Sequence, residues 1–331
     1  MVLNILLCMV GFALLYFAAE WLVKGSSSFA RNLGVKPIVI GLTVVAFGTS
    51  APELVVSLIS SVQGKSMIAV GNVVGSNICN IGLVLGMAAI FQPIICDRSV
   101  IRRDIPIMLG ISLYLLLLSM DSQIGRFEGA TLFGGIILYT LFNYRMATKD
   151  GNNPDGGSAT LAVELEGVGY IASRKRQIVM IVVGIVGVVF GAQMVVSSAV
   201  KIMTILGVSE KFIGLTVVAF GTSLPELATS VVAALRKEMD ISIGNLVGSN
   251  VFNIMSVLGV AAMLRPIPIP GGFIESGLIV DYLVMMVTSF LPWLLIRRRN
   301  TLSRPGGLLL LACYVGYIVY LIGSWGSGGP Y

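Results

Sequence analysis

The stretch IGLTVVAFGTSAPELVVSLISSVQGKSMIAVGNVVGSNICNIGLVLG, residues 40–86, occurs a second time as IGLTVVAFGTSLPELATSVVAALRKEMDISIGNLVGSNVFNIMSVLG, residues 213–259. The two copies align without a gap at an offset of 173, and 27 of their 47 positions are identical. Each copy is strongly apolar, yet it contains a glutamate, hydroxyl groups and asparagines. Carboxylates at membrane depth are costly and usually mark the path of an ion or substrate. Duplicated, interrupted apolar segments of this kind predict the binding site of a transporter.

The composition predicts an integral protein of the cell membrane. Hydrophobic residues make up 56% of the chain, charged residues 11%, and the mean hydropathy is +0.93, whereas soluble domains carry about 25% charged residues. The net charge of +6 is therefore interpreted as loop charge that orients the chain in the bilayer, not as a surface for nucleic acid. The chain has no histidine, and its four cysteines form no CxxC pair. These features argue against transition-metal and thiolate sites, so no cofactor is expected.

Ten segments are apolar and long enough to span a bilayer. They cover residues 2–23, 37–62, 66–91, 104–120, 128–144, 177–198, 209–235, 239–264, 278–296 and 307–325. Of the 22 Lys and Arg, 17 fall in alternate loops between these segments, so the positive-inside rule places those loops in the cytoplasm and both termini outside. We expect an all-α membrane protein of ten transmembrane helices, arranged as two inverted five-helix repeats. The halves would be residues 1–144 and 177–331, joined by a cytoplasmic linker at 145–176.

Each copy carries a proline that should bend its helix near the middle of the membrane. Pro52 has no N–H to bond the carbonyl of Gly48, which must then be satisfied by protein, water or an ion. Thr49, Ser50 and Glu53 are spaced so that hydroxyls, freed carbonyls and a carboxylate converge on one point. The second copy repeats the pattern with Pro225 and Gly221, and with Thr222, Ser223 and Glu226.

The span after each bend adds further oxygen groups. Asn72, Ser76 and Asn80 recur every four residues and therefore share one helix face. The second copy repeats this spacing with Asn245, Ser249 and Asn253. Two carboxylates with neutral oxygens, and without nitrogen or sulfur, suit Ca²⁺, which accepts roughly 6–8 oxygen ligands. Na⁺ is the natural competing ion for such a site.

Some of these residues also have a purely structural interpretation. Close helix packing best explains the glycines of the two GxxxG motifs, Gly71, Gly75, Gly244 and Gly248. Hydrogen bonding between helices explains four asparagines as well as an ion site does: Asn72, Asn77, Asn245 and Asn250. For Glu53 and Glu226 a structural role is a weak explanation, because neither has a basic residue near it in its own span.

The paired motifs GTSAPE…GNVVGSNICN and GTSLPE…GNLVGSNVFN resemble the two α-repeats of the cation/calcium exchanger superfamily, and most of all those of prokaryotic sodium/calcium exchangers. The resemblance implies a central Ca²⁺ site made by the carboxylates of Glu53 and Glu226 and the backbone carbonyls of Thr49 and Thr222. It also implies flanking Na⁺ sites and two asparagines that complete the centre. These further residues are Ser50, Ser76, Ser223, Ser249, the carbonyls of Ala46 and Ala219, and Asn80 and Asn253.

One position departs from a pattern within the superfamily. In some archaeal exchangers of this type an aspartate stands where this chain has Asn253. Asparagine in both copies removes a titratable group from the centre. Potassium-dependent relatives also tend to have an acidic residue there, so Asn253 argues against dependence on K⁺.

The resemblance implies a secondary antiporter that exchanges Na⁺ for Ca²⁺ by alternating access and functions as a monomer in the lipid bilayer. An H⁺/Ca²⁺ antiporter that uses the same glutamates is the alternative, although such members usually show a GN-containing motif where this chain has GTSxPE. A Ca²⁺ channel is less favoured, because an unpaired inverted repeat in a monomer argues against a continuous pore. An enzyme is not expected, since the sequence has neither a phosphate-binding glycine loop nor a phosphorylation motif.

The charge distribution predicts the sidedness of two positions. A cysteine introduced at Gly156 should react with a membrane-impermeant thiol reagent only from the cytoplasmic side, and one at Ser327 only from outside. Labelling of the unsubstituted chain controls for the four native cysteines. The reverse result at the two positions would overturn the orientation.

Overall fold

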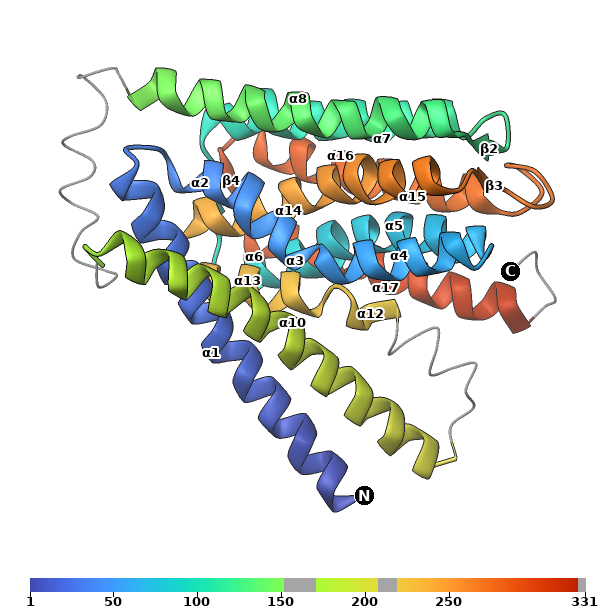
Figure 1. Cartoon of the computed structure of the whole chain (residues 1–331), viewed down its shortest axis with the longest axis horizontal. Helices are drawn as coiled ribbons and strands as arrows, with labels where there is room; N and C mark the ends of the chain where they lie inside the picture. Colours follow the sequence, from blue (N-terminus) through green and yellow to red (C-terminus); the bar gives the residue numbers. More distant parts are fainter. Residues whose placement is uncertain (152–170, 208–218, 327–331) are drawn as a thin grey trace. The chain divides into compact units, whose positions relative to one another are not determined.

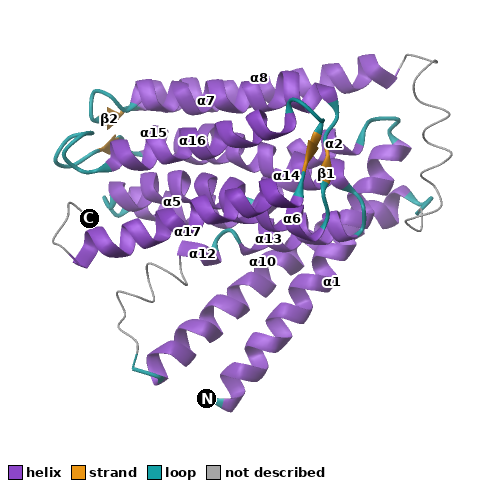
Figure 2. Ribbon diagram, turned by 180° about the vertical axis from the view of Figure 1, so that it is seen from behind, coloured by secondary structure: helices purple, strands orange, loops and turns teal. Residues whose placement is uncertain are grey.

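The computed structural model describes residues 1–151, 171–207 and 219–326, and these residues are mostly helical (Figures 1 and 2). The strands within these ranges are two residues long and form two antiparallel pairs. The pairs are β1 (Ile94–Ile95) with β4 (Thr301–Leu302), and β2 (Gln123–Ile124) with β3 (Ile267–Pro268). Most of the expected linker at 145–176 and the start of the expected span at 209–235 lie outside the described residues.

Six of the described helical segments are long and apolar enough to cross a membrane, and a bent pair makes a seventh. The six are α1 (Val2–Asn32), α5–η2–α6 (Ser66–Phe91), α10 (Arg174–Ile205), α14–η6–α15 (Met239–Leu264), α16 (Leu278–Ile296) and α17 (Arg304–Gly326). The bent pair comprises α2 (Pro37–Ile40), η1 (Gly41–Val45) and α3 (Ala46–Thr49), followed by α4 (Ala51–Val62). The others are η3 (Val100–Asp104), α7 (Ile105–Leu118), α8 (Arg126–Gly151), α12 (Ala219–Gly221) and α13 (Leu224–Leu235). The ten-span count and the sidedness of the termini stay predictions.

Two of the long segments contain a π-helical turn in the same place. α5 (Ser66–Cys79) continues through η2 (Asn80–Leu85) into α6 (Gly86–Phe91), and α14 (Met239–Phe252) continues through η6 (Asn253–Leu258) into α15 (Gly259–Leu264). The π turns begin at Asn80 and Asn253, which occupy equivalent positions in the two sequence copies. Single π turns inside α-helices are rare and occur frequently at functional sites.

The first helix is longer than its apolar pattern predicts. The helix α1 continues to Asn32, nine residues past the expected end of the apolar span at residue 23. The small residues 25–28 are buried in it, and Ser27 Oγ donates a hydrogen bond of 2.6 Å to Glu238 Oε1. Arg31 reaches the same oxygen at 2.9 Å. These tertiary contacts outweigh the low helix propensity of glycine and serine.

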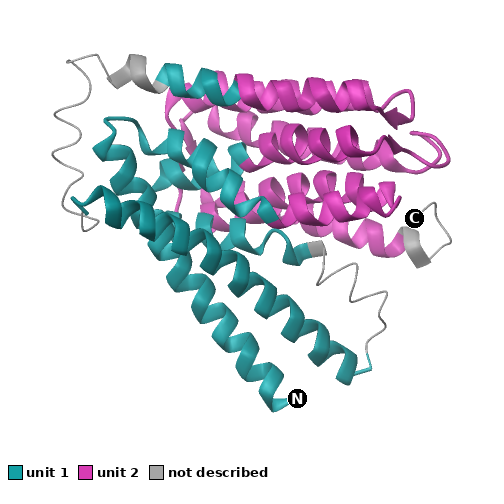
Figure 3. Cartoon of the chain, viewed as in Figure 1, with its two compact units in different colours: residues 1–51, 139–248 teal, residues 52–138, 249–331 magenta. Residues whose placement is uncertain are grey.

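The described chain divides into two compact units, which Figure 3 colours separately. Unit 1 contains residues 1–51 and 139–248, and unit 2 contains residues 52–138 and 249–331. Each unit therefore takes one part of the first sequence copy and one part of the second. The expected halves, divided by the linker, split the chain differently and stay a prediction.

Unit 1 is organised around α1 and α10, which lie side by side (Figures 1 and 2). Their facing apolar residues, among them Leu15, Leu22 and Val188, form one buried cluster. Gly184 permits the close approach, because a Cβ atom there would lie 2.8 Å from the Cα and the backbone nitrogen of Leu22.

Unit 2 packs α17 against α6 and α16 against α5 and α7. A Cβ atom at Gly307 of α17 would lie 2.6 Å from the carbonyl oxygen of Gly86 in α6. Tyr282 of α16 is fully buried, and its hydroxyl lies 2.8 Å from the hydroxyl of Ser119 at the end of α7. The pairing of β1 with β4 joins the chain just after α6 to the chain just before α17.

The close contact between α1 and α10 at Gly184 can be tested by its effect on stability. Gly184→Ala should lower the melting temperature of the detergent-solubilised protein by several degrees, because overpacking costs about 1–3 kcal/mol. Gly110→Ala in α7 is the matched control, since no atom beyond its chain neighbours and the nearby backbone of its own helix lies within 4 Å of the position where its Cβ would be. Equal melting temperatures for the two variants would contradict the close approach at Gly184.

Candidate functional site

The helix of the first sequence copy breaks where its proline predicts. α3 ends at Thr49, Ser50 leaves the helical conformation with φ −80° and ψ 6°, and α4 begins at Ala51. The two parts are bent by 45°. Because Pro52 has no N–H, the regular bonding cannot continue across this point. The predicted kink is thus confirmed, and Thr49 and Glu53 stand on either side of it.

The second copy breaks in the same way in its described part. α12 ends at Gly221, and α13 begins at Leu224 after Ser223, whose φ of −87° and ψ of 5° nearly equal those of Ser50. Pro225 lies in the first turn of α13. Thr222 lies between the two helices and is half-buried, and Ala219 begins α12.

In unit 1, hydroxyl groups of the first copy contact polar groups of the second. Ser50 Oγ donates to Glu226 Oε1 at 3.2 Å, and Thr49 Oγ1 donates to Asn245 Oδ1 at 3.1 Å. All four residues are at most 3% exposed. The carbonyl of Ala46 accepts the Ser50 N–H at 3.0 Å. The structure therefore brings together four of the polar residues singled out in the sequence.

In unit 2, Glu53 is fully buried, and an asparagine amide supports the helix that carries it. Asn72 Nδ2 donates to the backbone carbonyl of Glu53 at 3.2 Å and to Ser57 Oγ at 2.9 Å. The equivalent amide of the second copy, in unit 1, makes the equivalent bond: Asn245 Nδ2 donates to Ser230 Oγ at 3.0 Å. This repeated bond fixes the hydroxyl one helical turn beyond each glutamate.

Four further asparagines of unit 2 form a buried group between α5–η2 and α14–η6. Asn77 Nδ2 donates to the backbone carbonyl of Asn250 at 3.3 Å, and Asn250 Nδ2 donates to that of Asn77 at 3.4 Å. Asn80 Nδ2 donates to Asn250 Oδ1 at 3.1 Å, and Asn253 Nδ2 donates to Asn77 Oδ1 at 3.3 Å. All four are at most 1% exposed. The two expected ligands are thus held by Asn77 and Asn250, for which the sequence left hydrogen bonding between helices and an ion site equally open.

Several expected ligand atoms are buried. Among the described residues, Ser223 Oγ, Asn80 Oδ1 and Asn253 Oδ1 are buried oxygens for which no hydrogen-bond partner is found. Ser76 and Ser249 are 2% and 0% exposed. A buried polar atom without a partner is costly, so such atoms in a folded protein call for an explanation.

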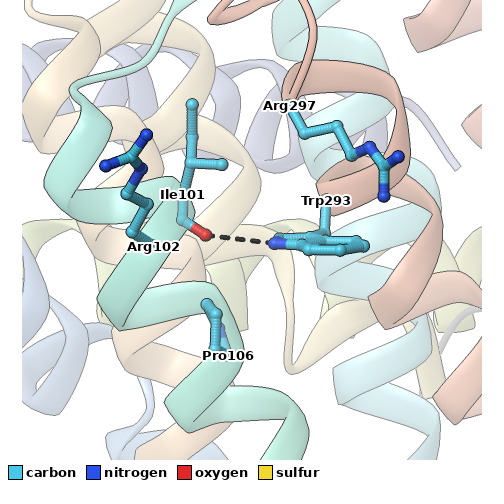
Figure 4. A pocket seen from close by; sticks show the side chains of 5 residues that line it. All are labelled: Ile101, Arg102, Pro106, Trp293 and Arg297. Carbon is cyan, nitrogen blue, oxygen red and sulfur yellow. Dashed lines mark hydrogen bonds between the residues drawn. The ribbon is translucent and has the colours of Figure 1, made fainter.

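A groove in unit 2 lies apart from these residues. Ile101, Arg102, Pro106, Trp293 and Arg297 line it, and Trp293 Nε1 donates to the carbonyl of Ile101 at 3.1 Å (Figure 4). The Arg297 guanidinium lies 5.2 Å from the centre of the Trp293 ring, and the Arg102 guanidinium points away from that ring (Figure 4). The groove contains none of the candidate ligands, and its arginines belong to loops expected on the cytoplasmic side.

Known proteins resemble this chain over almost its full length. The family model described as sodium/calcium exchanger protein matches residues 3–145 and 176–323. The putative antiporter CaxA of Alkalimonas amylolytica is 36% identical over 96% of this chain and 98% of its own length. The sodium/calcium exchanger MaX1 of Methanosarcina acetivorans is 31% identical over 96% of this chain and 98% of its own length.

Solved structures give the same result. A structure of the sodium-calcium exchanger NCX_Mj, soaked with Na⁺ and Ca²⁺, matches with a TM-score of 0.80 and 34% identity. The match covers 96% of this chain and 98% of that one. The fold, the duplicated motifs and the relatives agree, and this chain is a multi-pass integral membrane protein that belongs to the sodium/calcium exchanger family.

Proposed function

We propose that this protein is a secondary antiporter that exchanges Na⁺ for Ca²⁺, and that Glu53 and Glu226 both bind the transported Ca²⁺. The observation that carries the proposal is that both glutamates are fully buried within segments of a membrane protein. Carboxylates in such positions usually belong to an ion path. The names of the relatives support the choice of ions, since one is a sodium/calcium exchanger and the solved relative was soaked with Na⁺ and Ca²⁺.

The chemistry of the neighbouring groups supports a hard cation. Ca²⁺ takes oxygen ligands, chiefly carboxylates and the carbonyl oxygens of amides and the backbone, and Ser223, Asn80 and Asn253 add buried neutral oxygens to the two glutamates. We propose that these three oxygens bind transported cations. Ser50, Ser76 and Ser249, with the carbonyls of Ala46, Thr49, Ala219 and Thr222, complete the proposed ligand set.

Two carboxylates explain why such a protein exchanges ions instead of releasing them one way. The two negative charges of the glutamates are neutralised when one Ca²⁺ binds, and they are neutralised again when Na⁺ ions replace it. An empty site would carry uncompensated charge through a barrier of low dielectric, which is strongly unfavourable. The change between the inward-open and outward-open states is therefore favoured only when either Ca²⁺ or Na⁺ is bound. This is the requirement for coupled exchange.

The H⁺/Ca²⁺ alternative uses the same glutamates as proton carriers. The neutral hydroxyls favour Na⁺, because an oxygen without titratable charge can bind Na⁺ but cannot carry a proton between the two sides. Ser50 illustrates this, since its hydroxyl lies 3.2 Å from Glu226 Oε1 and adds an oxygen next to the carboxylate. A Ca²⁺ channel would need no such coupling.

Replacing either glutamate should stop Ca²⁺ transport without unfolding the protein. Glu53→Gln and Glu226→Gln each remove one of two charges at nearly constant volume, and a neutral amide is less costly to bury than a carboxylate. We expect Na⁺-driven uptake of radioactive calcium into proteoliposomes to fall to background in both variants. Glu275→Gln, at an exposed position, is the control and should transport normally. Normal uptake by either buried variant would refute its role as a Ca²⁺ ligand.

The coupling ion can be tested with the unmodified protein. Proteoliposomes loaded with Na⁺ and diluted into Na⁺-free buffer at equal pH should take up Ca²⁺, and an ionophore that dissipates the Na⁺ gradient should stop the uptake. Proteoliposomes with a pH gradient and no Na⁺ should take up little. Strong uptake with the pH gradient and none with the Na⁺ gradient would show that H⁺, not Na⁺, drives the exchange. Uptake without either gradient and without saturation would indicate a channel.

A further inference from the structure

We propose that Asn77 and Asn250 are positioning residues that orient the side-chain oxygens of Asn80 and Asn253 toward the transported cation. The inference rests on the proposed function, because it needs a cation for these oxygens to bind. It assigns a role to two residues that do not themselves supply a cation ligand. All four asparagines belong to unit 2.

The argument begins with two backbone carbonyls, which can only accept hydrogen bonds. The side chains of Asn77 and Asn250 each reach the main-chain carbonyl of the other residue, at 3.3 and 3.4 Å. Each must therefore present its NH₂ group to that carbonyl, since an oxygen there would face an oxygen. The sulfur of Met285, 3.9 Å from Asn77 Nδ2, is a second weak acceptor on the same side. The orientation of both amides is thus determined.

This orientation determines that of the two expected ligands. With their NH₂ groups on the carbonyls, Asn77 and Asn250 direct their side-chain oxygens at Asn253 and Asn80. Asn253 and Asn80 must therefore donate an N–H to these oxygens, so their own side-chain oxygens point away from Asn77 and Asn250. A flip of Asn80 or Asn253 would place two acceptors 3.1 or 3.3 Å apart. The two carbonyls therefore fix all four amides in turn.

The oxygens that are turned away are buried acceptors. Asn80 and Asn253 are both fully buried, and the described residues offer their Oδ1 atoms no hydrogen-bond donor. A buried acceptor that receives no hydrogen bond from the protein is unfavourable, so its position calls for an explanation. A bound cation would offset this cost, and amide oxygens are normal ligands of Ca²⁺.

The helix geometry places the two oxygens at equivalent points. Asn80 and Asn253 are the first residues of the π turns η2 and η6, whereas Asn77 and Asn250 lie three residues earlier in regular α-helix. Asn77 and Asn250 thus connect two regular helices. Asn80 and Asn253 follow at the π turns, where each helix is wider. The same arrangement occurs in both sequence copies.

The first test measures the apparent affinity for Ca²⁺. Asn77→Ala and Asn250→Ala should raise the KM for Ca²⁺ uptake about 10-fold or more, the usual effect of losing a group that orients a metal ligand. Asn143→Ala is the matched control. It is also a buried asparagine, and its amide donates to the carbonyl of Tyr139 in its own helix. Its KM should not change.

The second test separates orientation from packing. A carboxylate presents an oxygen whichever way it turns, so an aspartate ligand does not need an orienting partner. Asn77→Ala should therefore change KM less than about 2-fold when Asn253→Asp is already present, and Asn250→Ala should behave likewise with Asn80→Asp. In the crossed combinations, Asn77→Ala with Asn80→Asp and Asn250→Ala with Asn253→Asp, the full increase should remain.

The rise in melting temperature on adding Ca²⁺ to the detergent-solubilised variants gives a second reading that does not require transport. Serine variants, too short to hold the neighbouring amide, replace the alanine variants if those do not fold. An unchanged KM in Asn77→Ala, or equal increases in matched and crossed combinations, would overturn the positioning role. A wild-type protein that is stabilised by Ca²⁺ but shows no Na⁺-driven uptake would instead contradict the proposed exchange.

Discussion

The burial of two carboxylates in an apolar chain is the constraint on which the rest of the structure depends. Glu53 and Glu226 are fully buried, and an isolated carboxylate in a medium of low dielectric loses a large free energy of hydration. Polar groups must therefore reach the same depth. Each glutamate follows a break in its helix, at Ser50 or Ser223, where hydroxyls and backbone groups leave the regular hydrogen-bonding pattern.

Near the glutamates, the two sequence copies share residues and a hydrogen bond. Farther away, both their residues and their contacts differ. The amide that holds a hydroxyl beyond the glutamate occurs in both, as Asn72 with Ser57 and Asn245 with Ser230. By contrast, Glu238 binds Ser27 and Arg31 of α1, whereas the equivalent residue of the first copy is Lys65, of opposite charge. The amide–hydroxyl contact near each glutamate is thus repeated in both copies, whereas the contact that attaches α1 to Glu238 has no counterpart at Lys65.

The sequence predicts those features that depend on local chemistry. The bend at Pro52 follows from a missing N–H, and the bounds of the 66–91 and 239–264 segments follow from apolar runs. The end of α1 at Asn32 was missed, because the partner that stabilises residues 25–28 lies about 200 positions away in the chain. The sequence left Asn77 undecided between an ion site and a hydrogen bond between helices for the same reason. Its bonds run to the other copy, and spacing within one helix carries no information about them.

Neutral amides avoid a charge problem that further carboxylates would create. Under the proposed function, two glutamates already balance one Ca²⁺, and a third carboxylate would leave an uncompensated buried charge. Asparagine adds an oxygen without charge, but its NH₂ group repels a cation, so it can bind in only one of two orientations. Asn77 and Asn250 select that orientation before a cation arrives, which reduces the ordering that binding would otherwise require. Under this proposal, Asn253 can bind a cation well only together with Asn77, the residue that orients its amide.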